Sequence, residues 1–336
     1  MNIVMHQHRI QCQSPAGAHT MVVREWAAGY ANHSDQQGQS GLWGPSEDTG
    51  NIVSTGDTSI TARGAPVVVC VHGLTRNAAD FHALAHALAE DGMRVLAPDI
   101  VGRGDSDWLS DPQYYRIDQY CQDILAMVRQ LQLGSVYWVG TSMGGLIAMT
   151  LLGLFSKSLD ELGCTIEKLV LNDVGAEIPH AALSRIADYV GEPLVSSSLE
   201  EACQAMRTRM VSFGDHTEEQ WRLLTEPAVR RQSNGSWQVN YDLRIAEPFK
   251  ALMAAGQPQD LSASEPAPML LWPLYDAISC PTLLLRGALS DLLTGDVAQA
   301  MTQRGPKARL EEVPKVGHAP SLVTPEQINL VHQFLK

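Results

Sequence analysis

Hydrophobic and polar residues follow two regular patterns from residue 66 onward. Short apolar runs, typical of buried parallel strands, occur within 66–73, 94–99, 136–140, 168–175 and 280–287, and a weaker strand signal lies within 308–318. Between them, segments such as 80–92, 117–134 and 324–336 repeat apolar residues at helical spacing. Alternating strands and helices predict an α/β fold with a mostly parallel sheet. Residues 9–29 add a predicted hairpin that turns at 14–17.

Two segments interrupt this alternation. Residues 31–64 are rich in Gly, Ser, Asp and Thr, which predicts a long loop that is either disordered or ordered by packing of Leu42 and Trp43. Residues 178–274 show helical stretches at 181–191, 198–213 and 217–230 and no strong strand signal. We interpret them as a helical cap inserted into one catalytic domain, which is formed by residues 1–177 and 275–336.

Composition narrows the class of protein. The chain has 336 residues, is 45% hydrophobic and carries a formal net charge of −13, which disfavours nucleic acid and anionic membrane surfaces as partners. Its six cysteines include no C-x-x-C pair, so neither a metal site nor a disulfide framework is expected. Without an export signal or an apolar stretch long enough for a membrane span, the expected location is the cytoplasm. Oligomeric state leaves no signal in the sequence.

The segment Gly140-Thr-Ser142-Met-Gly144 follows a predicted buried strand and precedes a predicted helix. A strand-to-helix turn this tight needs glycines on both sides of the serine and leaves the hydroxyl exposed. A phosphate-binding loop is the alternative, but the segment lacks both the Lys-Ser/Thr ending and the G-x-G-x-x-G pattern. Ser142 is therefore predicted to be a nucleophile.

A serine nucleophile needs a base, and the base needs a carboxylate to orient it. Of eleven histidines, His318 alone lies on a loop between the last predicted strand and the last helix, preceded by a glycine. Asp291 lies 27 residues before it (318 − 291), just after a strand, and fits the order serine, acid, histidine. Asp291 is our preferred acid, with Asp173 as the alternative and Asp296 as a weaker rival.

Two further groups of residues complete the predicted site. The amides of Met143, after the nucleophile, and Leu74, after the first core strand, are the expected oxyanion-hole donors. His72 is expected to fix the Leu74 loop and not to take part in catalysis. Aromatic residues of the cap are the candidates for the substrate pocket: Trp221, Trp237, Tyr241 and Phe249.

The segments VHGLTRN, PDIVGRGDSD, GTSMGG, RGALSD and VGHAPS occur in this order over nearly all of the chain outside 31–64. In this respect the sequence resembles the α/β-hydrolase superfamily. The resemblance implies an eight-stranded, mostly parallel sheet, a lid inserted after the sixth strand, no cofactor, and hydrolysis through an acyl-enzyme. It leaves the substrate open, because this fold supports many activities.

The superfamily includes several activities that differ in their nucleophile and in the loops around it. Haloalkane dehalogenases and epoxide hydrolases use an aspartate nucleophile, which Ser142 excludes. Hydrolases that cleave C–C bonds in meta-cleavage dienoates usually carry Gly-Pro-Gly after the oxyanion His-Gly and Trp after the catalytic histidine, where this chain has Leu74-Thr75-Arg76 and Ala319-Pro320. We therefore expect a carboxylesterase for small to medium acyl chains, with lactones or hydroxyalkanoate oligomers as alternative substrates. The other hypotheses are that the protein cleaves C–C bonds, or that it is a ligand receptor without turnover.

Overall fold

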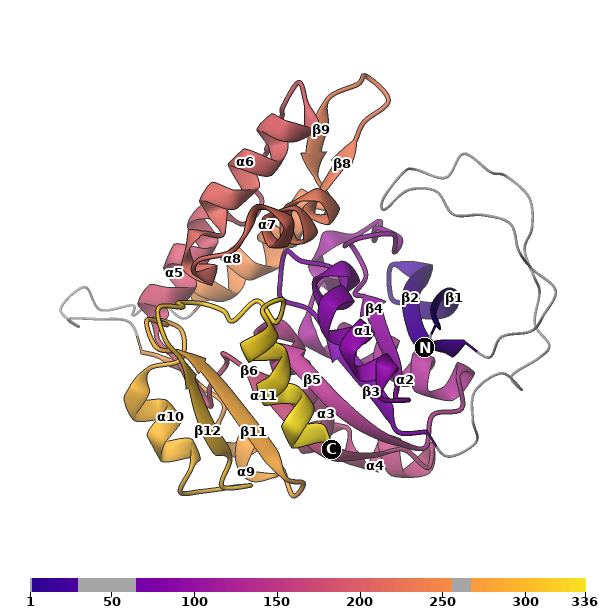
Figure 1. Ribbon diagram of the computed structural model, residues 1–336, viewed down its shortest axis with the longest axis vertical. Coiled ribbons are helices and arrows are strands. Elements are labelled where there is room, and N and C mark those ends of the chain that lie inside the picture. The colour runs from indigo at the N-terminus through magenta and orange to yellow at the C-terminus, as the bar shows by residue number, and fades with distance from the viewer. Residues whose placement is uncertain (1, 30–64, 256–266) are drawn as a thin grey trace.

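The computed structural model describes residues 2–29, 65–255 and 267–336 (Figure 1). The predicted loop at 31–64 therefore lies outside the described residues.

An eight-stranded sheet forms the centre of the molecule. Its strands in chain order are β1 (Asn2–Ser14), β2 (Gly17–Gly29), β3 (Val67–Val71), β4 (Arg94–Asp99), β5 (Ser135–Thr141), β6 (Thr165–Asn172), β11 (Thr282–Gly287) and β12 (Arg309–Val313). Their spatial order is β1-β2-β4-β3-β5-β6-β11-β12, in which β1 and β2 are antiparallel to each other and β2 is antiparallel to β4, while the remaining pairs are parallel. The expected mostly parallel sheet is confirmed.

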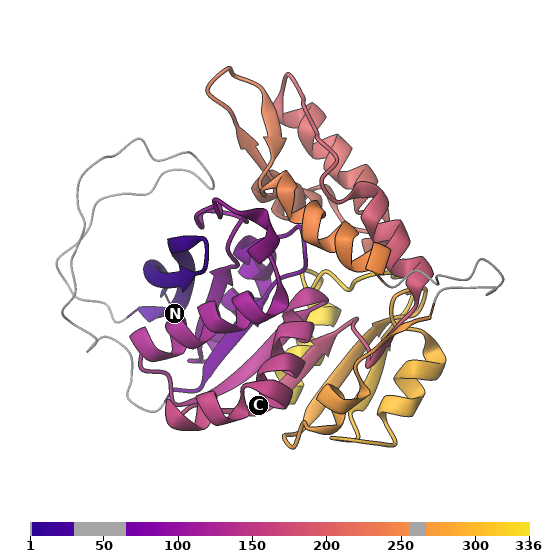
Figure 2. The same ribbon diagram turned by 180° about the vertical axis from the view of Figure 1, so that it is seen from behind.

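Helices cover both faces of the sheet, as Figures 1 and 2 show from opposite sides. One face packs against α1 (His82–Glu90) and α11 (Pro325–Leu335). The other packs against α2 (Ile117–Gln130), α3 (Met143–Leu154), α4 (Ser156–Glu161), α9 (Trp272–Asp276) and α10 (Gly295–Met301). Each face buries its own apolar cluster, because the strands alternate side chains between the two faces. Short 3₁₀ helices lie at Ala78–Phe81, Pro112–Tyr114, Val211–Phe213, Glu226–Ala228 and Leu243–Ile245.

Between β6 and β11 the chain leaves the sheet and forms a cap beyond the carboxyl ends of the parallel strands (Figure 1). The cap contains α5 (His180–Tyr189), α6 (Leu199–Arg209), α7 (Glu218–Thr225) and α8 (Ala246–Ala255). Two short antiparallel pairs of strands accompany these helices: β8 (Val229–Arg231) with β9 (Trp237–Val239), and β7 (Glu177–Ile178) with β10 (Met269–Leu270). The sequence does not predict these pairs, because two or three residues are too few for an alternating pattern to emerge. The domain boundaries at 178 and 274 stay a prediction.

No helix in the described parts of the chain is both long and apolar enough to cross a lipid bilayer.

Candidate active site

Ser142 lies in the turn between β5 and α3, in a backbone conformation that non-glycine residues seldom adopt (φ 51°, ψ −110°). The two flanking glycines make the turn possible. A Cβ on Gly140 would lie 2.4 Å from the carbonyl carbon of Gly144, and a Cβ on Gly144 would lie 2.0 Å from the backbone oxygen of Val71. A side chain on Gly140 would therefore collide with the start of α3, and one on Gly144 would collide with the end of the neighbouring strand β3.

A chain of hydrogen bonds connects Ser142 to a buried carboxylate through His318. His318 Nε2 lies 3.0 Å from Ser142 Oγ, and His318 Nδ1 lies 2.7 Å from Asp173 Oδ2. A carboxylate only accepts, so Nδ1 carries the ring proton and leaves Nε2 free to accept from the serine hydroxyl. The imidazole is thus held in the tautomer that a general base requires.

The structure pairs His318 with the alternative acid, Asp173, and not with the preferred Asp291. Asp173 is fully buried directly after β6, where its Oδ1 accepts from the Gly287 amide (2.9 Å) and its Oδ2 accepts from Ser290 Oγ (2.7 Å). Asp291, after β11, instead pairs with Arg185 of the cap helix α5 at 2.6 and 2.7 Å. The difference follows the order of the strands: Asp173 follows β6, which adjoins the strand β5 that leads into Ser142, whereas Asp291 follows β11, one strand further away.

Asp291 differs from Asp173 in exposure as well as in partner. Its side chain is 49% exposed. Partial burial alone would raise the pKa of Asp291, but its hydrogen bonds with the Arg185 guanidinium lower the pKa below the ordinary value. The weaker rival, Asp296, is exposed in the first turn of α10.

The cap holds the loop that carries His318. Ser212 Oγ donates to the backbone oxygen of His318 (2.7 Å), and the Gly317 amide donates to the backbone oxygen of Ser212 (2.7 Å). One turn further on, His216 Nε2 lies 2.7 Å from Ser321 Oγ. Sequence reasoning missed Ser212, because no local pattern connects residue 212 with residue 318.

The loop after β3 is fixed by two buried residues. His72 Nδ1 donates to the Gly73 oxygen (2.8 Å), and His72 Nε2 accepts from the Ile100 amide (3.0 Å), which keeps the ring neutral. Burial lowers the pKa of His72 to about 3. Arg103, also fully buried, donates through Nε to the Leu74 oxygen (2.8 Å). These contacts hold the Gly73 and Leu74 carbonyl groups, and both residues line the same cavity as Ser142. Sequence reasoning did not identify Arg103.

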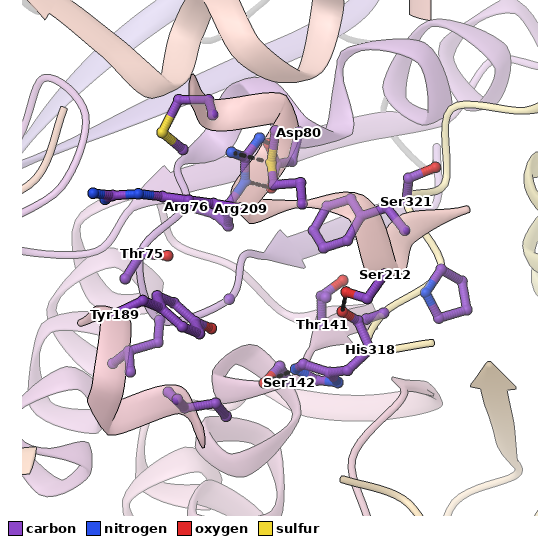
Figure 3. Close-up of a pocket in the computed structure, with 18 of the residues that line it drawn as sticks. Thr75, Arg76, Asp80, Thr141, Ser142, Tyr189, Arg209, Ser212, His318 and Ser321 are labelled. Atoms are coloured by element: carbon purple, nitrogen blue, oxygen red, sulfur yellow. Dashed lines mark hydrogen bonds and ion pairs between the residues drawn. The ribbon is translucent and has the colours of Figure 1, made fainter. Parts of the chain in front are cut away.

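A cavity opens between the carboxyl ends of the central strands and the cap, with Ser142 and His318 on its wall (Figure 3). Of the four aromatic residues predicted for the pocket, Tyr241 lines it and the other three do not. Trp221 packs against His216, Trp237 lies in the β8–β9 pair, and Phe249 packs against the core from α8. The apolar lining comes from other residues: Leu74, Phe81, Ile186, Met206, Met210 and Phe213.

A sequence profile of the alpha/beta hydrolase fold matches residues 66–325, which is most of the chain. The chain belongs to the α/β-hydrolase family. It is a hydrolase of that type, as the superfamily motifs of the sequence indicate.

Relatives of this α/β hydrolase span nearly its whole length. A 3-hydroxybutyrate-oligomer hydrolase of Cupriavidus necator is 38% identical over 329 residues, which cover 97% of this chain and 96% of that protein. An esterase of Mycobacterium tuberculosis is 27% identical and covers 84% of this chain and 86% of its own. Among solved structures, an α/β hydrolase from Novosphingobium aromaticivorans superposes with a TM-score of 0.73 at 32% identity, covering 98% of both chains.

One buried cluster outside the cavity has the residue types of a metal site. Cys12, His19 and Asp123 place their ligand atoms within 4.8 Å of one another, and His19 Nε2 lies 3.1 Å from Asp123 Oδ2. Burial, together with the nearby Asp123 charge, raises the pKa of Cys12, which opposes formation of a thiolate ligand. Gln119 also donates to Asp123 (2.8 Å), so the carboxylate is already well partnered. We interpret the cluster as a buried polar contact that joins β1, β2 and α2.

Proposed function

We propose that this α/β hydrolase cleaves carboxylic esters, with short 3-hydroxybutyrate oligomers as its substrates and Ser142, His318 and Asp173 as its catalytic residues. The hydrogen-bonded chain Ser142–His318–Asp173 at the cavity wall is the observation that carries the proposal. The choice of oligomer is supported by the 38% identity with the oligomer hydrolase over 97% of this chain. It refines the expectation of a carboxylesterase for small to medium acyl groups.

In the first half of the reaction, Ser142 Oγ attacks the ester carbonyl carbon while His318 Nε2 takes its proton. Negative charge develops on the carbonyl oxygen, to which the amides of Leu74 and Met143 would donate hydrogen bonds. Met143 is the first residue of α3, so the positive end of that helix adds to the stabilisation. The tetrahedral intermediate collapses, His318 returns the proton to the departing alcohol oxygen, and an acyl-Ser142 ester remains.

Water completes the reaction by the same route in reverse. His318 Nε2 removes a proton from water, hydroxide oxygen bonds to the acyl carbon, and the Ser142 ester bond breaks as His318 reprotonates Oγ. Throughout both halves, Asp173 holds the imidazole through Nδ1 and stabilises its positive charge. The contacts of Asp173 with Gly287 and Ser290 keep that carboxylate in place.

The cavity suits a chain of alternating methyl and ester groups. Apolar side chains such as Leu74, Phe81 and Met210 line it beside the hydroxyl-bearing Thr75 and Thr141. A wall on which apolar side chains alternate with hydroxyl and charged groups can contact both the methyl groups and the oxygens of such a chain.

Purified protein tests the proposal with the linear trimer of 3-hydroxybutyrate, p-nitrophenyl butyrate and a meta-cleavage dienoate. We expect release of 3-hydroxybutyrate from the trimer, seen by chromatography, and loss of that release in Ser142→Ala. Turnover of p-nitrophenyl butyrate without turnover of the trimer would overturn the substrate assignment and leave the esterase. Faster turnover of the dienoate would favour C–C cleavage, and no turnover of any of the three would overturn the enzymatic proposal.

A further inference from the structure

Three arginines line the cavity, and two of them are matched by a carboxylate. Arg76 binds Asp80 through Nε (2.9 Å) and a terminal nitrogen, and it also donates to the Leu224 oxygen (2.7 Å). Arg185 binds Asp291 through two nitrogens. The charges of these two guanidinium groups are therefore balanced within the protein.

The third arginine, Arg209, has no such partner. Its terminal nitrogens donate only to the backbone oxygens of Glu192 and Pro193, both at 3.3 Å, and no carboxylate in the described parts of the chain lies within ion-pair distance. The side chain of Glu192 turns instead to Lys250 (3.9 Å). A guanidinium has five N–H donors, so Arg209 keeps donors available for a ligand.

Arg209 stands at the end of α6, across the cavity from Ser142 and His318 (Figure 3). Its position distinguishes it from Arg207 on the same helix, which binds Glu218 (2.9 and 3.2 Å), has its guanidinium 5.0 Å from the centre of the Trp221 ring, and does not line the cavity. Of the two arginines, Arg207 is therefore paired with a protein carboxylate, whereas Arg209 borders the cavity without one.

We propose that Arg209 binds the terminal carboxylate of the substrate, so that this hydrolase acts on acidic esters in preference to neutral ones. The inference rests on the proposed ester hydrolysis at Ser142. A protein of net charge −13 repels anions at long range, so an acidic substrate needs a local cation to hold it. Guanidinium binds carboxylates with two parallel hydrogen bonds, which also fixes the direction of the bound ligand.

For a 3-hydroxybutyrate oligomer, the free carboxylate belongs to the last hydroxy-acid unit. Binding of this group at Arg209 places the carboxyl end of the oligomer in the cavity and the preceding ester bonds toward Ser142. The substrate class is therefore esters that end in a free carboxylate, and a methyl ester of the same oligomer lacks the recognised group.

The direct test compares kcat/KM for the trimer acid and for its methyl ester. Loss of a hydrogen bond to a charged group predicts that Arg209→Gln lowers kcat/KM for the acid about 10- to 150-fold and changes that for the methyl ester less than about 3-fold. Arg209→Lys should retain part of the preference, and the matched control Arg207→Gln should leave it intact. An equal loss on both esters, or no loss on either, would overturn the inference.

Binding separates this inference from the proposed reaction. In the Ser142→Ala background, which cannot form the acyl-enzyme, calorimetry should show that adding Arg209→Gln raises the Kd of the trimer acid about 10- to 150-fold, whereas adding Arg207→Gln does not. Equal Kd values in these double variants would overturn the role of Arg209. Binding that depends on Arg209, without release of 3-hydroxybutyrate by the wild type, would overturn the proposed function and leave the carboxylate site.

Discussion

The two walls of the cavity are built in different ways. On the sheet side, backbone geometry holds Ser142 and Asp173: glycines that admit no Cβ, a buried carboxylate with three donors, and a helix that starts directly after Ser142. The cap wall presents Arg185, which is exposed and held by an ion pair, and Arg209, which is half-buried and held by long contacts with backbone oxygens. In the proposed function, reaction chemistry therefore resides on the wall held by backbone geometry, and recognition resides on the wall where side chains can change at little cost to the fold.

Ser142→Ala should have the largest effect of all the variants and tests whether the sheet wall carries the reaction. The variant removes the only nucleophile of the proposed mechanism, so kcat should fall on the order of 10⁶-fold. Steady-state hydrolysis of p-nitrophenyl butyrate measures the loss, and thermal unfolding serves as the control for folding. A variant that keeps more than a hundredth of the activity would show that the reaction does not use this serine.

The two candidate acids provide the next test. Asp173→Asn keeps the shape of the side chain but reverses the hydrogen bond to His318 Nδ1 and favours the wrong tautomer, so kcat should fall on the order of 10⁴-fold. Asp291→Asn loses an exposed pair with Arg185 and should change kcat less than about 3-fold. The reverse ranking of the two variants would return the catalytic role to Asp291.

Buried His72 should make the stability of the fold depend on pH. Burial lowers the pKa of His72 to about 3, whereas an unfolded histidine titrates near 6.5. Between these values the unfolded state binds the additional proton, so the free energy of unfolding falls as the pH drops from about 6.5 toward 3. One proton gives a slope of up to about 1.4 kcal/mol per pH unit.

Two measurements check this expectation. The His72 ring should remain neutral at pH 5 in imidazole nitrogen shifts of the folded protein. His216 of the cap is less deeply buried, so His216→Asn should remove less of the pH slope than His72→Asn in urea titrations. Protonation of His72 above pH 5 in the folded state would contradict the assigned environment.

The sequence predicts Ser142 and His318 because the residues next to each of them form a recognisable local pattern. Ser142 is flanked by glycines after an apolar run, and His318 follows a glycine after the last strand; the structure brings the two together at 3.0 Å. Asp173 and Asp291 both follow a strand and both precede His318, so chain order cannot separate them. Their difference comes from strand adjacency and from the positive φ of Asp173 (56°), which no local pattern reveals.

The cap is harder to predict because its side chains are placed by tertiary packing. Helical spacing predicts α5, α6 and α7, yet it does not tell which polar residue of α6 faces the cavity, so Arg209 and Arg207 look alike in the sequence. Aromatic residues are equally uninformative there: Trp221 and Tyr241 are both buried, but only Tyr241 borders the cavity.

Ser212→Ala gives the smallest expected effect and tests the junction between the two walls. The variant removes the hydrogen bond from Ser212 Oγ to the His318 oxygen but leaves the Gly317–Ser212 backbone contact, so kcat should fall about 2- to 10-fold with KM nearly unchanged. Ser212→Thr keeps the hydroxyl and should recover most of the loss, while Thr208→Ala, on the exposed face of α6, should have no effect. A rise in KM at constant kcat would instead assign Ser212 to substrate binding, because a residue that positions His318 acts on the reaction step and not on affinity.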